Sequence, residues 1–75
     1  MNDYQKELLQ NTLEARRREV VEYETNITNY ALALERIGDD PDLVQFGELL
    51  AELMRTAKIE CKKAKIMLDV VESQL

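Results

Sequence analysis

The stretch that decides the fold is Ile37-Gly38-Asp39-Asp40-Pro41-Asp42-Leu43, near the middle of a chain of 75 residues. Gly38 suits the position just after a helix, because glycine adopts the left-handed backbone conformation without steric cost. Asp40 suits the N-cap of a second helix, with Pro41 at its first position, where a missing N–H loses no hydrogen bond. Stop and start signals this close together predict a turn over residues 38–41 between two antiparallel helices. A calcium loop does not fit this stretch, because the glycine required at its sixth position would be an aspartate.

Apolar residues recur at heptad spacing on both sides of the turn. Upstream, the pattern predicts a helix over about residues 3–37, opened by a capping box between Asn2 and Gln5. Its expected inner positions are Leu9, Leu13, Arg16, Val20, Tyr23, Ile27, Tyr30, Leu34 and Ile37. Downstream, the pattern predicts a helix over about residues 41–74. Its expected inner positions are Leu43, Phe46, Leu50, Leu53, Ala57, Glu60, Ala64, Met67 and Val71.

The two series of inner positions match one another when the chain is folded about residue 40. Each inner position of one helix then lies opposite an inner position of the other, as antiparallel packing requires. Arg16 and Glu60 are the charged residues in these series, and they fall about one turn apart on opposing helices. We therefore predict a structural ion pair between them, which fixes the register more than it stabilises the fold. The expected fold is all-α: one antiparallel two-helix hairpin of coiled-coil type over residues 1–75.

The second helix carries more apolar surface than one neighbouring helix covers. A helix that is apolar over more than half its circumference is normally buried on more than one side. A two-helix hairpin also has little core of its own. We therefore expect a homodimer that forms a four-helix bundle, with docking onto a different protein as the alternative. The expected interface residues are Leu49, Met54, Ile59, Cys61, Ile66, Leu68, Val70 and Leu75.

The composition limits the classes of function. The chain has no histidine, one cysteine and a net charge of −5. No nucleophile can therefore pair with a histidine base, and no usual set of transition-metal ligands is present. We expect no enzymatic activity, no catalytic or metal-binding residue and no cofactor. The single cysteine, the absence of a secretory signal and the lack of a long apolar run predict a cytoplasmic protein that does not contact a membrane.

A basic stripe on the second helix is the one charged feature of interest. Its residues share one helix face at spacings of three and four: Arg55, Lys58, Lys62 and Lys65. Such a stripe could contact the phosphates of a nucleic acid. We favour a solvated outer face instead, because no aromatic residue is interleaved and acidic residues lie at helical spacing from two of the four.

By elimination, the sequence favours a non-enzymatic protein–protein interaction module. Such a chain would be a small adaptor, inhibitor or assembly factor that presents helical surface to a protein of unknown identity. The alternative is a dimeric helical hairpin that binds nucleic acid through the basic stripe. A third possibility is a subunit that is stable only within a larger complex.

Overall fold

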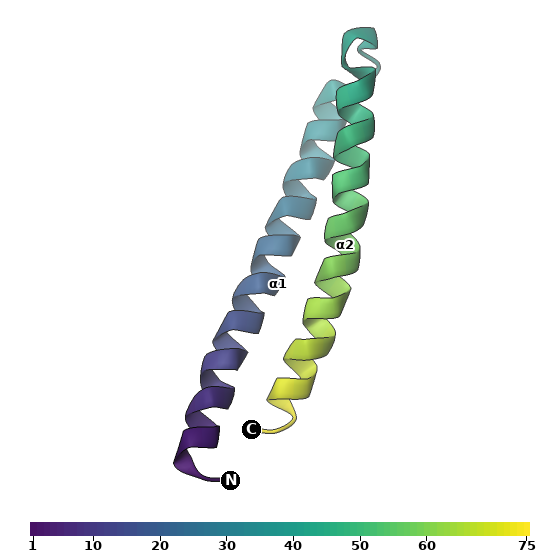
Figure 1. Cartoon of the computed structure of the whole chain (residues 1–75). Helices are drawn as coiled ribbons and strands as arrows, with labels where there is room; N and C mark the ends of the chain where they lie inside the picture. The colour runs from purple at the N-terminus through teal and green to yellow at the C-terminus, as the bar shows by residue number, and fades with distance from the viewer.

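The computed structural model describes all residues, 1–75, and consists of two long helices that run antiparallel and side by side (Figure 1). Helix α1 spans Asp3–Ile37, the 3-10 turn η1 spans Pro41–Leu43, and helix α2 spans Val44–Glu72. The all-α hairpin predicted from the sequence is therefore confirmed. The molecule is a rod of 60 × 14 × 13 Å with a radius of gyration of 17.2 Å, against about 11 Å for a compact domain of this length. Neither helix contains a segment long and apolar enough to cross a membrane.

The start of α1 is fixed by a reciprocal pair of hydrogen bonds. The backbone N–H of Gln5 donates to the side chain of Asn2 at 2.8 Å, and the N–H of Asn2 donates to Gln5 Oε1 at 3.1 Å. This is the expected capping box, and it satisfies two backbone donors that no helical carbonyl can reach. Asp3 in the first turn and Arg36 in the last turn carry the charges that the helix dipole favours.

The turn combines a glycine stop with an aspartate start. Gly38 has a φ of +54°, a conformation that favours glycine, and its N–H donates to the carbonyl of Leu34 at 3.3 Å. The carboxylate of Asp40 accepts a hydrogen bond from the N–H of Asp42 at 2.9 Å, and Pro41 is the first residue of η1. The cap predicted at Asp40 is present, but it begins a 3-10 turn, and α2 itself starts three residues later than expected.

This later start changes which residues of α2 face α1. The buried and half-buried apolar positions of α2 follow alternating steps of three and four residues: Gly47, Leu50, Met54, Ala57, Cys61, Ala64, Leu68 and Val71. We call this series, with the inner residues of α1, the seam. Four of the expected inner residues are exposed instead, namely Leu43, Phe46, Leu53 and Met67. The predicted series on α2 was therefore wrong at these four of its nine positions, whereas the predicted inner residues of α1 are buried or half-buried.

Two contacts show the register of the hairpin. A Cβ placed on Gly47 would lie 3.9 Å from Cγ2 of Ile37, and Val20 shares a buried cluster with Cys61 and Ala64. The pair 37 with 47 is centred on residue 42, and the packing of Val20 against Cys61 and Ala64 gives a centre between 40.5 and 42, whereas the sequence had suggested residue 40. The shift arises because η1 uses the residues that had been assigned to the first turn of the second helix. It also leaves the α2 side of the seam free of charged residues, which are costly to bury.

The core of the hairpin is small. Six residues are buried, and none of them is fully enclosed. Small side chains on α2, such as Cys61 and Ala64, lie in the cluster against which Tyr23 and Ile27 of α1 pack. Pairing bulky with small residues lets the helices approach closely, but it buries little apolar area for each residue of chain. The hairpin therefore has limited stability from its own core.

Candidate interaction surfaces

One side of the rod is bridged by charges. Arg17 Nη2 lies 3.7 Å from Glu72 Oε1, and Lys65 Nζ lies 3.8 Å from Glu24 Oε1. These are the two ion pairs that join α1 to α2, and their side chains are all about half exposed. Each contributes at most about 1 kcal/mol, because solvent screens exposed pairs. This charged side is therefore already occupied by contacts within the chain.

The other side of the rod carries an uncovered apolar stripe. On α2 it follows the helical spacing adjacent to the seam, on the flank opposite to that of Lys65, and we define the apolar stripe as Phe46, Leu49, Leu53, Met67 and Val70. All five are 40–55% exposed. The polar residues Thr56, Glu60 and Lys63 continue the same spacing between its two apolar ends. About half of the surface of these side chains is exposed, so their apolar area remains available to a partner.

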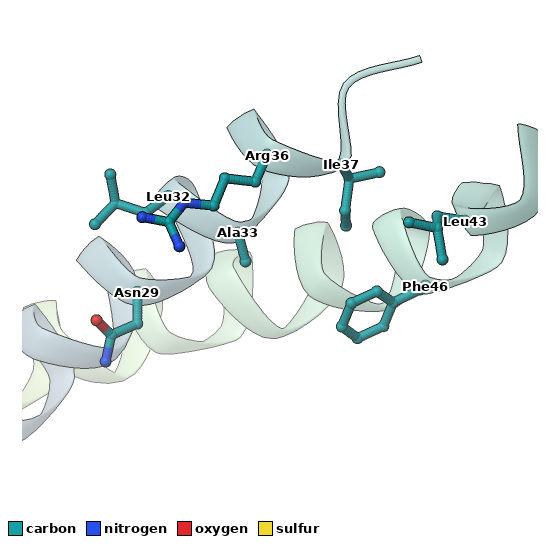
Figure 2. A pocket seen from close by; sticks show the side chains of 7 residues that line it. All are labelled: Asn29, Leu32, Ala33, Arg36, Ile37, Leu43 and Phe46. Carbon is teal, nitrogen blue, oxygen red and sulfur yellow. The ribbon is translucent and has the colours of Figure 1, made fainter. Parts of the chain in front are cut away.

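A shallow groove extends the stripe at the turn end of the rod. It has a volume of about 560 Å³ and is lined by Asn29, Leu32, Ala33, Arg36, Ile37, Leu43 and Phe46. Figure 2 shows Leu43 reaching into the groove from the turn and Phe46 from α2, while Ile37 and Ala33 line the groove on α1. The guanidinium of Arg36 lies beside Leu32 at its edge. The groove is therefore mainly apolar, with one cation at its rim.

The basic stripe predicted from the sequence is exposed, but its charge is partly neutralised. Arg55 forms an ion pair with Glu52, and Lys65 forms the pair with α1 described above. Lys58 and Lys62 are the two members with no acidic group within ion-pair distance. The neighbouring Lys63, on the other flank, pairs with an acidic residue one turn away. Two cations on a chain of net charge −5 make a weak site for a polyanion.

The predicted ion pair between Arg16 and Glu60 is not formed. Arg16 pairs with Glu19 at 3.0 Å, and Glu60 pairs with Lys63 at 3.0 Å, so each finds its partner on its own helix. The cause is the shifted register, which places position 16 opposite position 68 and moves Glu60 to the flank of α2. Nε of Arg16 is buried and donates no hydrogen bond within the chain. Arg16 is therefore only partly satisfied where it lies.

The eight residues expected to form an interface divide into two groups. Cys61 is only 5% exposed, and Met54 and Leu68 are half-buried, so these three belong to the seam and are not available as an outer flank. The other five are exposed, namely Leu49, Ile59, Ile66, Val70 and Leu75. Sequence reasoning also missed Phe46, Leu53 and Met67 as surface residues, because it placed them in the seam. A usable signal existed, since the seam series on α2 is the one that contains no charged residue.

The acidic and sulfur-containing side chains do not converge on a common point. No three of the Cys, Asp and Glu residues are grouped so that they could hold a metal ion. The free thiol of Cys61 is buried in the seam beside Val20. The surfaces that distinguish this molecule are therefore the apolar stripe with its groove and the two-lysine remainder of the basic stripe. Neither a family model, nor a curated protein, nor a solved structure matches this chain.

Proposed function

We propose that this chain is a non-enzymatic protein–protein interaction module that acts through the apolar side of its helical rod. The observation that carries the proposal is the apolar stripe of α2, whose five large side chains are 40–55% exposed. Complete burial of such a side chain contributes about 1.5–3 kcal/mol, so covering five half-exposed ones contributes about 4–8 kcal/mol from this side of an interface. That gain is of the size needed to offset the loss of freedom on association, about 4–15 kcal/mol.

The shape of the stripe indicates the form of the partner surface. Within each of its two apolar ends, its members recur at steps of three and four residues, which is the pattern that a second helix with its own apolar face covers. The groove at the turn end accepts a further apolar side chain, and Arg36 at its rim favours an acidic neighbour there. An adaptor or assembly factor that presents one helical face fits this surface. A cytoplasmic location belongs to the same proposal, because the one cysteine has no partner for a disulfide within the chain.

The test is purification of crosslinked complexes from the native host with three forms of the chain. Wild type should retain a specific protein partner. Leu49→Lys places a charge in the middle of one apolar end of the stripe and should remove that partner. Val21→Lys is the matched control, because Val21 is 63% exposed on α1 and should leave binding unchanged. If neither a host protein nor a second copy of the chain is retained, or if Leu49→Lys retains what wild type retains, the apolar stripe is not an interaction surface.

Nucleic-acid binding is the alternative, and the two unpaired lysines are the observation that favours it. It predicts a salt-dependent shift of RNA or DNA that is lost in the double variant Lys58→Glu with Lys62→Glu. We expect no shift even at low salt, because the net charge of the chain is −5. A shift that the double variant abolishes would replace the protein-interaction proposal.

A further inference from the structure

The apolar stripe is symmetric about the middle of α2. Phe46 and Val70 lie at equal distances in sequence from residue 58, and so do Leu49 and Met67. Helix α2 itself, Val44–Glu72, has its midpoint at the same residue. A reversed copy of the helix therefore matches it over its whole length, with apolar ends against apolar ends. An interface of this kind is isologous: each contact between two positions is made twice, once on each side of a two-fold axis.

The polar centre of the stripe restricts the register of such a pair. With the axis beside residue 58, Thr56 lies opposite the partner's Glu60, and Leu53 lies along the aliphatic stem of the partner's Lys63. A slip of one heptad in one direction carries Phe46 beyond the end of the partner's α2. A slip in the other direction sets Leu49 against the partner's Glu60. One register therefore covers all five members of the stripe, and the neighbouring ones do not.

The exposed area of the chain exceeds that of a compact monomer by about the area that a dimer interface buries. The chain exposes 5847 Å², whereas a compact monomer of 8.7 kDa would expose about 4,700 Å². The excess, about 1,100 Å², is of the size that each partner buries in a standard stable interface, about 800 Å². A single helix-to-helix contact along α2, Val44–Glu72, is the simplest way to cover much of it.

The charged side of the rod is unsuited to the same arrangement. Lys58 lies on that side at the midpoint of α2, so a two-fold axis there would set Lys58 against its own copy. The ion pairs from Lys65 and Glu72 to α1 also occupy that side. The apolar stripe is therefore the side of α2 that favours contact with a second copy of the chain.

From this symmetry of the stripe we infer that a second copy of the chain covers it. The two α2 helices run antiparallel about a two-fold axis that passes through the apolar side at the level of residue 58. The product is a four-helix bundle with the α2 helices at its centre. This inference shares with the proposed function the premise that the stripe is an interaction surface. It adds the identity of the partner, a second copy of the chain.

Sedimentation equilibrium of the purified chain at micromolar concentration provides the first test. Wild type and Val21→Lys should both show twice the chain mass of 8.7 kDa. Leu49→Lys and Met67→Glu should each raise the dimer dissociation constant by at least about 100-fold, because each buries an uncompensated charge. A monomeric wild type, or a Leu49→Lys variant that remains dimeric, would overturn the inference.

Mixing the two variants tests the antiparallel register and does not depend on how well each folds alone. In the inferred register, the lysine introduced at 49 in one chain meets the glutamate introduced at 67 in the other, while the second 49–67 contact stays wild type. An equimolar mixture should therefore recover the mass of a dimer and a helical circular dichroism signal. A mixture that stays dissociated would refute the register. A monomeric wild type that still retains a host protein through the stripe would refute the second copy while leaving the proposed function intact.

Discussion

Replacing Val20 with alanine measures how much burial in the seam contributes to the free energy of unfolding. Val20 is 9% exposed and lies in the buried cluster with Cys61 and Ala64. The next residue, Val21, is 63% exposed on the same helix. The two valines therefore form a matched pair, because Val→Ala removes the same atoms from the same helical backbone and only the surroundings differ.

The expected magnitudes follow from burial and helix propensity. Val20→Ala removes two buried carbon groups worth about 0.8 kcal/mol each, and a residual cavity adds to that loss. Alanine returns about 0.5 kcal/mol at either site, because it is the better helix former. Val20→Ala should therefore lower the free energy of unfolding by about 1–2 kcal/mol, and Val21→Ala should raise it by about 0.5 kcal/mol.

Urea and thermal unfolding followed by circular dichroism measure this difference. A change of 1 kcal/mol shifts the melting temperature of a domain this small by about 4–8 °C. Protein concentration must be equal in all samples, since self-association would couple to unfolding. If the two variants unfold at the same urea concentration, Val20 does not lie in a packed seam.

Three further predictions concern the two glycines, the ion pair that is not formed and the buried cysteine. Gly47→Ala should stabilise the hairpin by up to about 1 kcal/mol, because alanine is the better helix former and its methyl group would lie at an ordinary contact distance, 3.9 Å, from the nearest side chain. Gly38→Ala should instead lower the melting temperature, because the φ of residue 38 is +54°, which strains any residue other than glycine. A double-mutant cycle on Arg16 and Glu60 should give a coupling energy below about 0.5 kcal/mol in urea unfolding, and a coupling of several times that size would restore the ion pair expected from the sequence. Cys61 should react with thiol reagents far more slowly in the native chain than in urea, and equal rates would show that it lies outside the seam.

The parts of this fold that local chemistry specifies could be predicted from the sequence. The capping box at Asn2, the glycine stop at Gly38 and the aspartate cap at Asp40 each depend on residues a few positions apart. The inner face of α1 could also be predicted, because apart from Arg16 its inner positions form one apolar heptad series. These features involve interactions within one helix or one turn, so the order of residues along the chain determines them.

The inner face of α2 could not be predicted in the same way. Leu50, Ala57, Ala64 and Val71 form a complete heptad series with either of two neighbours: Phe46, Leu53, Glu60 and Met67 on one flank, or Met54, Cys61 and Leu68 on the other. The two choices differ by a rotation of about 50° about the helix axis, which is half the angle between successive residues. Periodicity alone does not separate them, because both repeat every seven residues.

The amino-acid sequence by itself determined two helices, the end of α1 at the turn and their antiparallel arrangement, since propensity, capping and heptad spacing act over short distances along the chain. The tertiary structure decided how α2 is rotated against α1. The 3-10 turn over Pro41–Leu43 sets the point at which α2 begins, and packing against α1 selects the series on α2 that carries no charge. That rotation buries Cys61 and exposes Phe46 and Met67, so the candidate surface exists only as a consequence of packing between residues that are far apart in the chain.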